Sequence, residues 1–165
     1  MQRWMNRVDG MLRILIGMDF LILFILNVGQ ITSRSIVGIS SVLIPDISRF
    51  LFIWMVFLGT ASIYKNKQHL IIEFLKLKFP QKLQHQLSIL TDLVMMIFFI
   101  ILIRAGWRMM VVRMDIPYTG WEVPTGYAYL AVPISASLML LFTLVNLYEE
   151  LKRGKLQKAS AIMVE

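Results

Sequence analysis

The chain has 165 residues, of which 58% are hydrophobic, with a mean hydropathy of +0.69 and a net charge of +7 at pH 7. It is more apolar than a typical soluble domain, which predicts an integral membrane protein. It contains no cysteine, which excludes disulfides, cysteine nucleophiles and cysteine-bound metals. Its cations lie beside the ends of apolar runs, where they encode membrane topology, so we expect no nucleic-acid partner.

Four apolar runs dominate the chain, at residues 11–31, 46–64, 87–109 and 126–148. A helix needs roughly 20 apolar residues to cross the hydrocarbon of a bilayer. Inside lipid the backbone amides must bond within their own segment, so each run is expected to be a helix. The first run is too long for a signal peptide and lacks a small-residue cleavage site after it, so we expect it to be retained. The prediction is an all-α integral membrane protein with four transmembrane helices in a single membrane domain, residues 1–165.

The distribution of cations predicts the orientation of the helices. If the N-terminus is cytoplasmic, most of the 17 Lys and Arg residues lie on the inner side of the membrane. Loops that remain in the cytoplasm carry an excess of Lys and Arg. We therefore expect an N-in, C-in, multi-pass protein.

The loop between the second and third runs, residues 65–86, has an apolar pattern of its own. Residues 70–79 are too few to span a bilayer, and Glu73 and Lys76 share one helical face with apolar residues over most of the rest. This pattern predicts a short amphipathic helix lying in the membrane interface. The alternative is that this segment simply prolongs the second helix. The polar tail, residues 154–165, is predicted to be disordered.

Two acids lie within the apolar runs, and ionisable residues inside a membrane are candidates for function. Asp19 is the deepest and shares its predicted helix with Asn27 and Gln30. It is either a proton or cation site, or an acid that faces the bundle and pairs with a cation. Asp92 lies near the inner end of the third run and is expected to be a structural polar contact. Both are predicted to be buried polar residues.

Arg104 and Arg108 are spaced i,i+4 and therefore share a face of the third helix. They either receive an anionic substrate or act as anchors. As anchors they would extend to lipid phosphates or pair with acids of the same layer, such as Asp46, Asp115 or Glu122.

The sequence lacks a recognisable catalytic set. His69 and His85 are its only histidines and have no carboxylate cluster beside them, so they form a poor metal site. There is no nucleophile motif or phosphate-binding loop. We therefore expect no enzymatic activity, no cofactor and no metal in this chain, and the pattern favours an accessory subunit.

Residues 45–75 read PDISRFLFIWMVFLGTASIYKNKQHLIIEFL. This stretch resembles the most characteristic part of the small Q subunit of tripartite ATP-independent periplasmic (TRAP) transporters. The matching positions are Asp46, Arg49, Trp54, Phe57, Gly59 and His69. Upstream, Arg34 and Gly38 resemble the end of the family's first helix. Downstream, Pro124, Gly126, Tyr129 and Pro133 resemble its signature before the last helix. The likeness covers residues 30–150, although Pro45 and one Asp stand where the family usually has Glu.

The resemblance implies that this chain supports a large multi-span permease subunit in the bacterial inner membrane, surrounded by lipid. In such systems a periplasmic binding protein delivers an organic acid, such as a C4-dicarboxylate or sialic acid, and the large subunit imports it with sodium. Sodium coupling is then expected in the large subunit and not here. The motif residues become candidates for the partner interface or for packing within this chain. The area of Trp54 and Phe57 beside the small Gly59 predicts that the second helix contacts the partner. The alternative is a self-sufficient small oligomeric transporter or channel that uses Asp19.

Overall fold

The computed structural model describes the backbone of residues 2–36, 38, 41–78 and 81–162. Side chains are described for residues 7–36, 38, 41–65, 86–87 and 89–148. Five helices form the described chain: α1 (Gln2–Ile36), α2 (Leu43–Lys78), α3 (Gln81–Arg113), α4 (Gly126–Tyr129) and α5 (Ala131–Ile162). Four segments are long and apolar enough to cross a membrane: Arg7–Ile36, Leu43–Lys65, Ile89–Arg113 and Gly126–Tyr148. The predicted all-α architecture with four membrane-spanning helices is confirmed.

Two segments differ from the prediction. Residues 70–78 continue α2 without a break, so they do not form a separate helix. No glycine or proline interrupts residues 60–78 of the sequence, so nothing there breaks the helix before Lys78. Likewise α5 continues to Ile162 through the tail that was predicted to be disordered, which is rich in good helix formers such as Leu, Gln, Lys and Ala. Residues 163–165 lie outside the described part of the chain.

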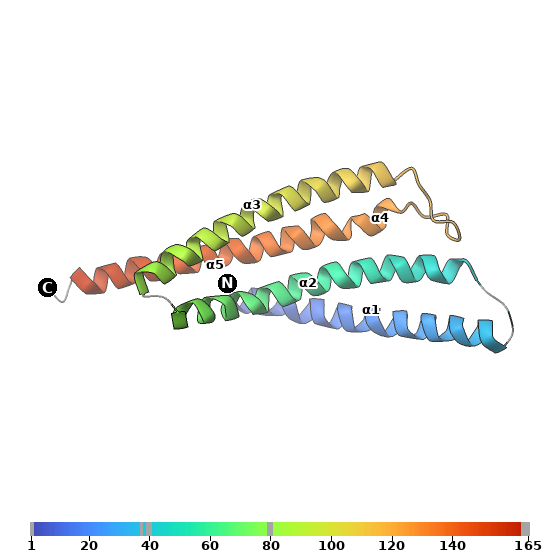
Figure 1. Cartoon of the computed structure of the whole chain (residues 1–165), viewed down its shortest axis with the longest axis horizontal. Coiled ribbons are helices and arrows are strands. Elements are labelled where there is room, and N and C mark those ends of the chain that lie inside the picture. Colours follow the sequence, from blue (N-terminus) through green and yellow to red (C-terminus); the bar gives the residue numbers. More distant parts are fainter. Residues whose placement is uncertain (1, 37, 39–40, 79–80, 163–165) are drawn as a thin grey trace.

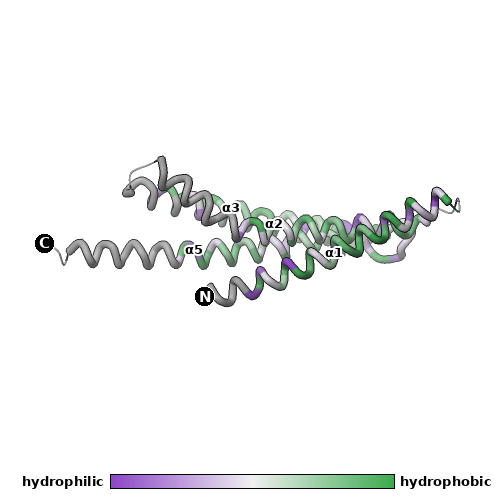
Figure 2. Tube along the Cα trace, turned by 90° about the horizontal axis from the view of Figure 1, so that it is seen from below, coloured by the Kyte–Doolittle hydropathy of each residue, from purple (hydrophilic) through white to green (hydrophobic). Residues whose placement is uncertain are grey.

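The long helices lie side by side in the order α1, α2, α5, α3 (Figure 1). The most extensive contacts join α1 to α2 and α3 to α5, and α2 packs on α5 between these two pairs. Figure 2 shows apolar residues along the middle of the helices and polar ones gathered nearer their ends. The chain is therefore a row of helices in which the two outer members, α1 and α3, each keep a broad face free of this chain's other helices.

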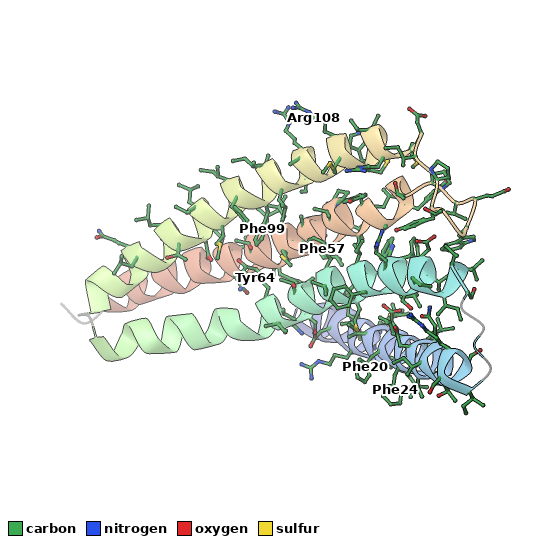
Figure 3. All side chains as sticks on the ribbon, turned by 45° about the vertical axis from the view of Figure 1, so that its right-hand side comes forward. Phe20, Phe24, Phe57, Tyr64, Phe99 and Arg108 are labelled. Atoms are coloured by element: carbon green, nitrogen blue, oxygen red, sulfur yellow. The ribbon has the colours of Figure 1, made fainter. Side chains whose placement is uncertain are left out.

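A small core joins α2, α3 and α5. Ala61, Phe99 and Met139 are buried together, with Tyr64 packed against them. The ring of Tyr64 meets that of Phe99 edge-on with centroids 5.0 Å apart, and its hydroxyl lies 2.9 Å from the Thr143 hydroxyl. Figure 3 shows Tyr64 and Phe99 between the two helix pairs. This contact fixes the position of the α1–α2 pair against the α3–α5 pair.

Candidate functional site

The N-terminal end of α2 is fastened to the loop before α4 by Asp46. The backbone N–H of Gly120 donates a hydrogen bond to Asp46 Oδ2 at 2.7 Å, and Asp46 is 8% exposed. A Cβ at Gly120 would lie 2.7 Å from the carbonyl carbon of Val42, so only glycine fits there. A carboxylate in the first turn also interacts favourably with the helix dipole. Asp46 therefore holds the loop onto α2, while Arg49 one turn later is exposed.

Aromatic rings strengthen the same junction. Phe50 of α2 meets Trp121 of the loop edge-on, with centroids 5.7 Å apart, and Trp121 stacks on Tyr118 at 6.3 Å. Burial raises the pKa of the Tyr118 phenol above its usual value, so this ring stays neutral at physiological pH. Trp54 packs against Phe50 at 6.3 Å, and its buried Nε1 has no hydrogen-bond partner among the described residues. The loop between α3 and α4 therefore packs against the beginning of α2.

Residues 124–126, which belong to the family-like motif before the last helix, pack against the end of α3. The Thr125 hydroxyl donates hydrogen bonds to the carbonyl oxygens of Arg113, at 3.1 Å, and Ile116, at 2.9 Å. A Cβ at Gly126 would lie 2.7 Å from the Met110 carbonyl oxygen, which explains the glycine. The Arg113 guanidinium lies over the Tyr129 ring, 5.9 Å from its centroid. Pro124, next to Thr125, pairs with Pro117 across this turn.

The close approach of α3 and α5 depends on a glycine that the sequence did not single out. Gly106 is buried, and a Cβ there would lie 2.8 Å from Val132 Cγ1 and 2.9 Å from Pro133 Cδ. Pro133, predicted as a site residue, is therefore part of the helix–helix packing. A glycine inside a long apolar helix was the available signal, because small residues permit close packing in membranes.

The remaining motif residues differ in how closely the rest of the chain packs around them. A Cβ at Gly59 would meet nothing within 4 Å, in contrast to Gly106 and Gly126. Phe57 is partly buried and lies on the side of α2 that faces the other helix pair (Figure 3). Arg34 is exposed in the last turn of α1. The side chain of His69 lies outside the described residues, so its predicted role stays a prediction.

A second cluster, which was not predicted from the sequence, joins the beginning of α1 to the second half of α2. Ser62 donates a hydrogen bond to Asp9 Oδ1 at 2.6 Å, and Asp9 Oδ2 lies 3.6 Å from Lys65 Nζ and 3.1 Å from Arg13 Nη2. Asp9, Ser62 and Lys65 are all buried. The i,i+4 spacing of Asp9 and Arg13 was the only local signal. The cluster forms a polar lock between the two helices.

The two acids predicted to be buried belong to different helix pairs. Asp19 lies on α1 between the Asp9 cluster and the contact in which Asn27 donates a hydrogen bond to the Ser48 hydroxyl at 3.3 Å. Asp19 Oδ1 is buried and has no hydrogen-bond partner among the described residues. Asp92 is 7% exposed and lies on α3. Asp92 is therefore buried, whereas Asp19 is only partly buried, and the two acids lie on helices of different pairs.

Arg104 and Arg108 lie on the outer face of the helix row. Both are exposed on α3, and Arg108 points away from the other helices (Figure 3). The ion pairs found between two described side chains do not include Arg104 or Arg108, so a pairing with Asp46, Asp115 or Glu122, one of the predicted alternatives, is not found there. The described side chains likewise contain no group of three or more His, Asp or Glu that would hold a metal ion.

Comparison with known proteins agrees with this architecture. Residues 23–153 match the family model of the DctQ component of tripartite ATP-independent periplasmic transporters. A protein of Haemophilus influenzae (strain ATCC 51907 / DSM 11121 / KW20 / Rd) is 31% identical over 104 residues, and its name is "Putative TRAP transporter small permease protein". The match covers 62% of this chain and 63% of that protein, so the chain spans less than two thirds of its relative. The chain belongs to the DctQ family, the small membrane component of TRAP transporters.

Proposed function

We propose that this chain is the scaffold subunit that supports a large permease subunit in the bacterial inner membrane. The observation that carries the proposal is the open row of helices. The most apolar stretches of α1, α2 and α3 are only 6%, 11% and 17% buried in the chain, against 44% for the last span. A row with two free faces suits a subunit that packs against a larger membrane protein, because close packing drives helix association in lipid.

The same proposal covers the rest of the transport system. The N- and C-termini face the cytoplasm, and the large subunit carries an organic acid inward together with sodium. A periplasmic binding protein delivers that substrate. This chain takes part in no chemical step and needs no cofactor. The loop held by Asp46 and Trp121 lies on the periplasmic side in this orientation.

The first prediction concerns the dependence of transport on a partner. Reconstituted alone in liposomes, the chain is expected to transport no organic acid. Uptake should appear when the large subunit, the binding protein and an inward sodium gradient are all present. The measurement is accumulation of a labelled organic acid, with liposomes that lack the small subunit as the control. Sodium- or proton-driven uptake by this chain alone would overturn the scaffold function and favour the self-sufficient transporter.

The second prediction concerns Asp19, the residue that a self-sufficient transporter would use. If Asp19 is structural, Asp19→Asn should keep at least roughly half of the uptake rate of the assembled complex, because an amide still forms hydrogen bonds but carries no charge. Initial uptake rates of purified, intact complexes measure this. Asp19→Leu serves as the companion variant, since it removes the polar group and should lower complex yield further. An assembled, stable Asp19→Asn complex without uptake would instead assign Asp19 to an ion pathway.

A further inference from the structure

The exposed arginines of α3 lie deep in the membrane span. Ile101 is the middle residue of the span Ile89–Arg113, so Arg104 lies about 5 Å and Arg108 about 10 Å from the middle at 1.5 Å per residue. Exposed apolar side chains border them on the same face, among them Ile97, Ile101 and Val111. Charged groups at this depth face the interior of an assembly or a water-filled cavity, because exposure to hydrocarbon is costly.

The direction of α3 makes lipid phosphate a poor partner for Arg104. Side chains of a helix lean towards its N-terminus. Both arginines lie in the C-terminal half of the span, so they lean towards the middle of the membrane and away from the nearer surface. Arg108 is near enough to that surface to extend to it. Arg104 lies one turn deeper and would have to extend past Arg108.

A second copy of this chain is also a poor partner for this face. Most homodimers are two-fold symmetric and bring the same patch of both subunits together. Such a dimer would place two arginine pairs opposite each other with no acid between them on this face. A different protein that carries acidic groups is complementary in charge.

We propose that the α3 face around Arg104 and Arg108 is a docking surface for a helix of the large permease subunit that carries a carboxylate near the middle of the membrane. This inference rests on the proposed scaffold function and adds the surface and the chemistry of the contact. The guanidinium group of an arginine suits a carboxylate because it donates two parallel hydrogen bonds to it. The pairing removes both charges from lipid at once.

The test is recovery of the large subunit on the affinity-tagged small subunit after detergent extraction. We expect Arg104→Leu to lower recovery roughly tenfold, because it leaves a carboxylate of the partner unpaired, and Arg104→Lys to lower it less. Insertion of the variant itself should not suffer, because leucine replaces a charge in an apolar stretch. Arg7→Leu, the same change at an exposed arginine at the beginning of the first span, is the matched control and should keep normal recovery.

A crosslinking experiment identifies the occupant. The chain has no cysteine, so Ile101→Cys introduces a unique site for a photoactivated crosslinker on this face. The expected product joins this chain to the large subunit. Crosslinks only to lipid or to a second copy, or normal recovery with Arg104→Leu, would overturn the docking surface. Failure of the unmodified chain to retain the large subunit would instead overturn the scaffold function, so the two failures are distinguishable.

Discussion

Replacing Gly106 by alanine is expected to destabilise the subunit by about 1–3 kcal/mol, the usual cost of overpacking a well-packed contact. The new Cβ would lie 2.8 Å from Val132 Cγ1 and 2.9 Å from Pro133 Cδ. Val132 can change its rotamer, but the ring of Pro133 is part of the backbone of α5. Relief therefore requires α3 and α5 to separate, and these helices form the most extensive contact in the chain.

Thermal denaturation of the purified subunit in detergent measures this effect. Gly59→Ala is the matched control, because Gly59 also lies inside a long helix but has open space around its Cα. It should gain about 0.5–1 kcal/mol, since alanine costs less conformational entropy than glycine in a helix. Gly126→Ala should destabilise like Gly106→Ala, because its Cβ would meet the Met110 carbonyl oxygen at 2.7 Å. Equal melting temperatures for Gly106→Ala and Gly59→Ala would contradict the close approach of α3 and α5.

The four membrane spans could be predicted because the bilayer sets their length. An apolar run of about 20 residues has no other stable structure in lipid. The ends of α2 and α5 could not be predicted in the same way. Hydropathy shows only where the apolar part of a helix ends. The polar residues that follow, such as those of the tail, can continue the helix. The helices thus continue to Lys78 and Ile162, beyond the predicted bounds.

Part of the packing could be predicted from motifs, but not the partner of each residue. Asp46 and Gly126 were singled out by resemblance, and the structure shows why an acid and a glycine stand there. Asp46 binds a backbone amide 74 residues away, a contact that no local pattern encodes. The roles of Gly106 and Asp9 were not predicted for the same reason, because each role depends on which helix packs beside the residue. The order α1, α2, α5, α3 supplies that information.

Replacing Asp9 by alanine is expected to destabilise the contact between α1 and α2 by about 3 kcal/mol, at the lower end for breaking a buried ion pair. Asp9 and Lys65 side chains are both 8% exposed, so their charges are poorly screened by water. The variant removes the carboxylate near Lys65 and the acceptor of the 2.6 Å hydrogen bond from Ser62. A short hydrogen bond to a charged oxygen is among the stronger ones in proteins.

Two control variants separate this lock from ordinary surface charge effects. Arg13 also contacts Asp9, but its side chain is 62% exposed, so Arg13→Ala should cost less than about 1 kcal/mol. Asp115→Ala removes an acid that is exposed in the loop after α3 and should change little. The measurement is thermal denaturation in detergent, together with the rate of protease cleavage in the connection between α1 and α2. We expect Asp9→Ala to melt well below both controls and to be cleaved faster, because it loses the hydrogen bond from Ser62 and the ion pair with Lys65 that join α1 to α2. If Asp9→Ala behaves like Arg13→Ala, the cluster is a surface ion pair and apolar packing alone holds α1 in the row.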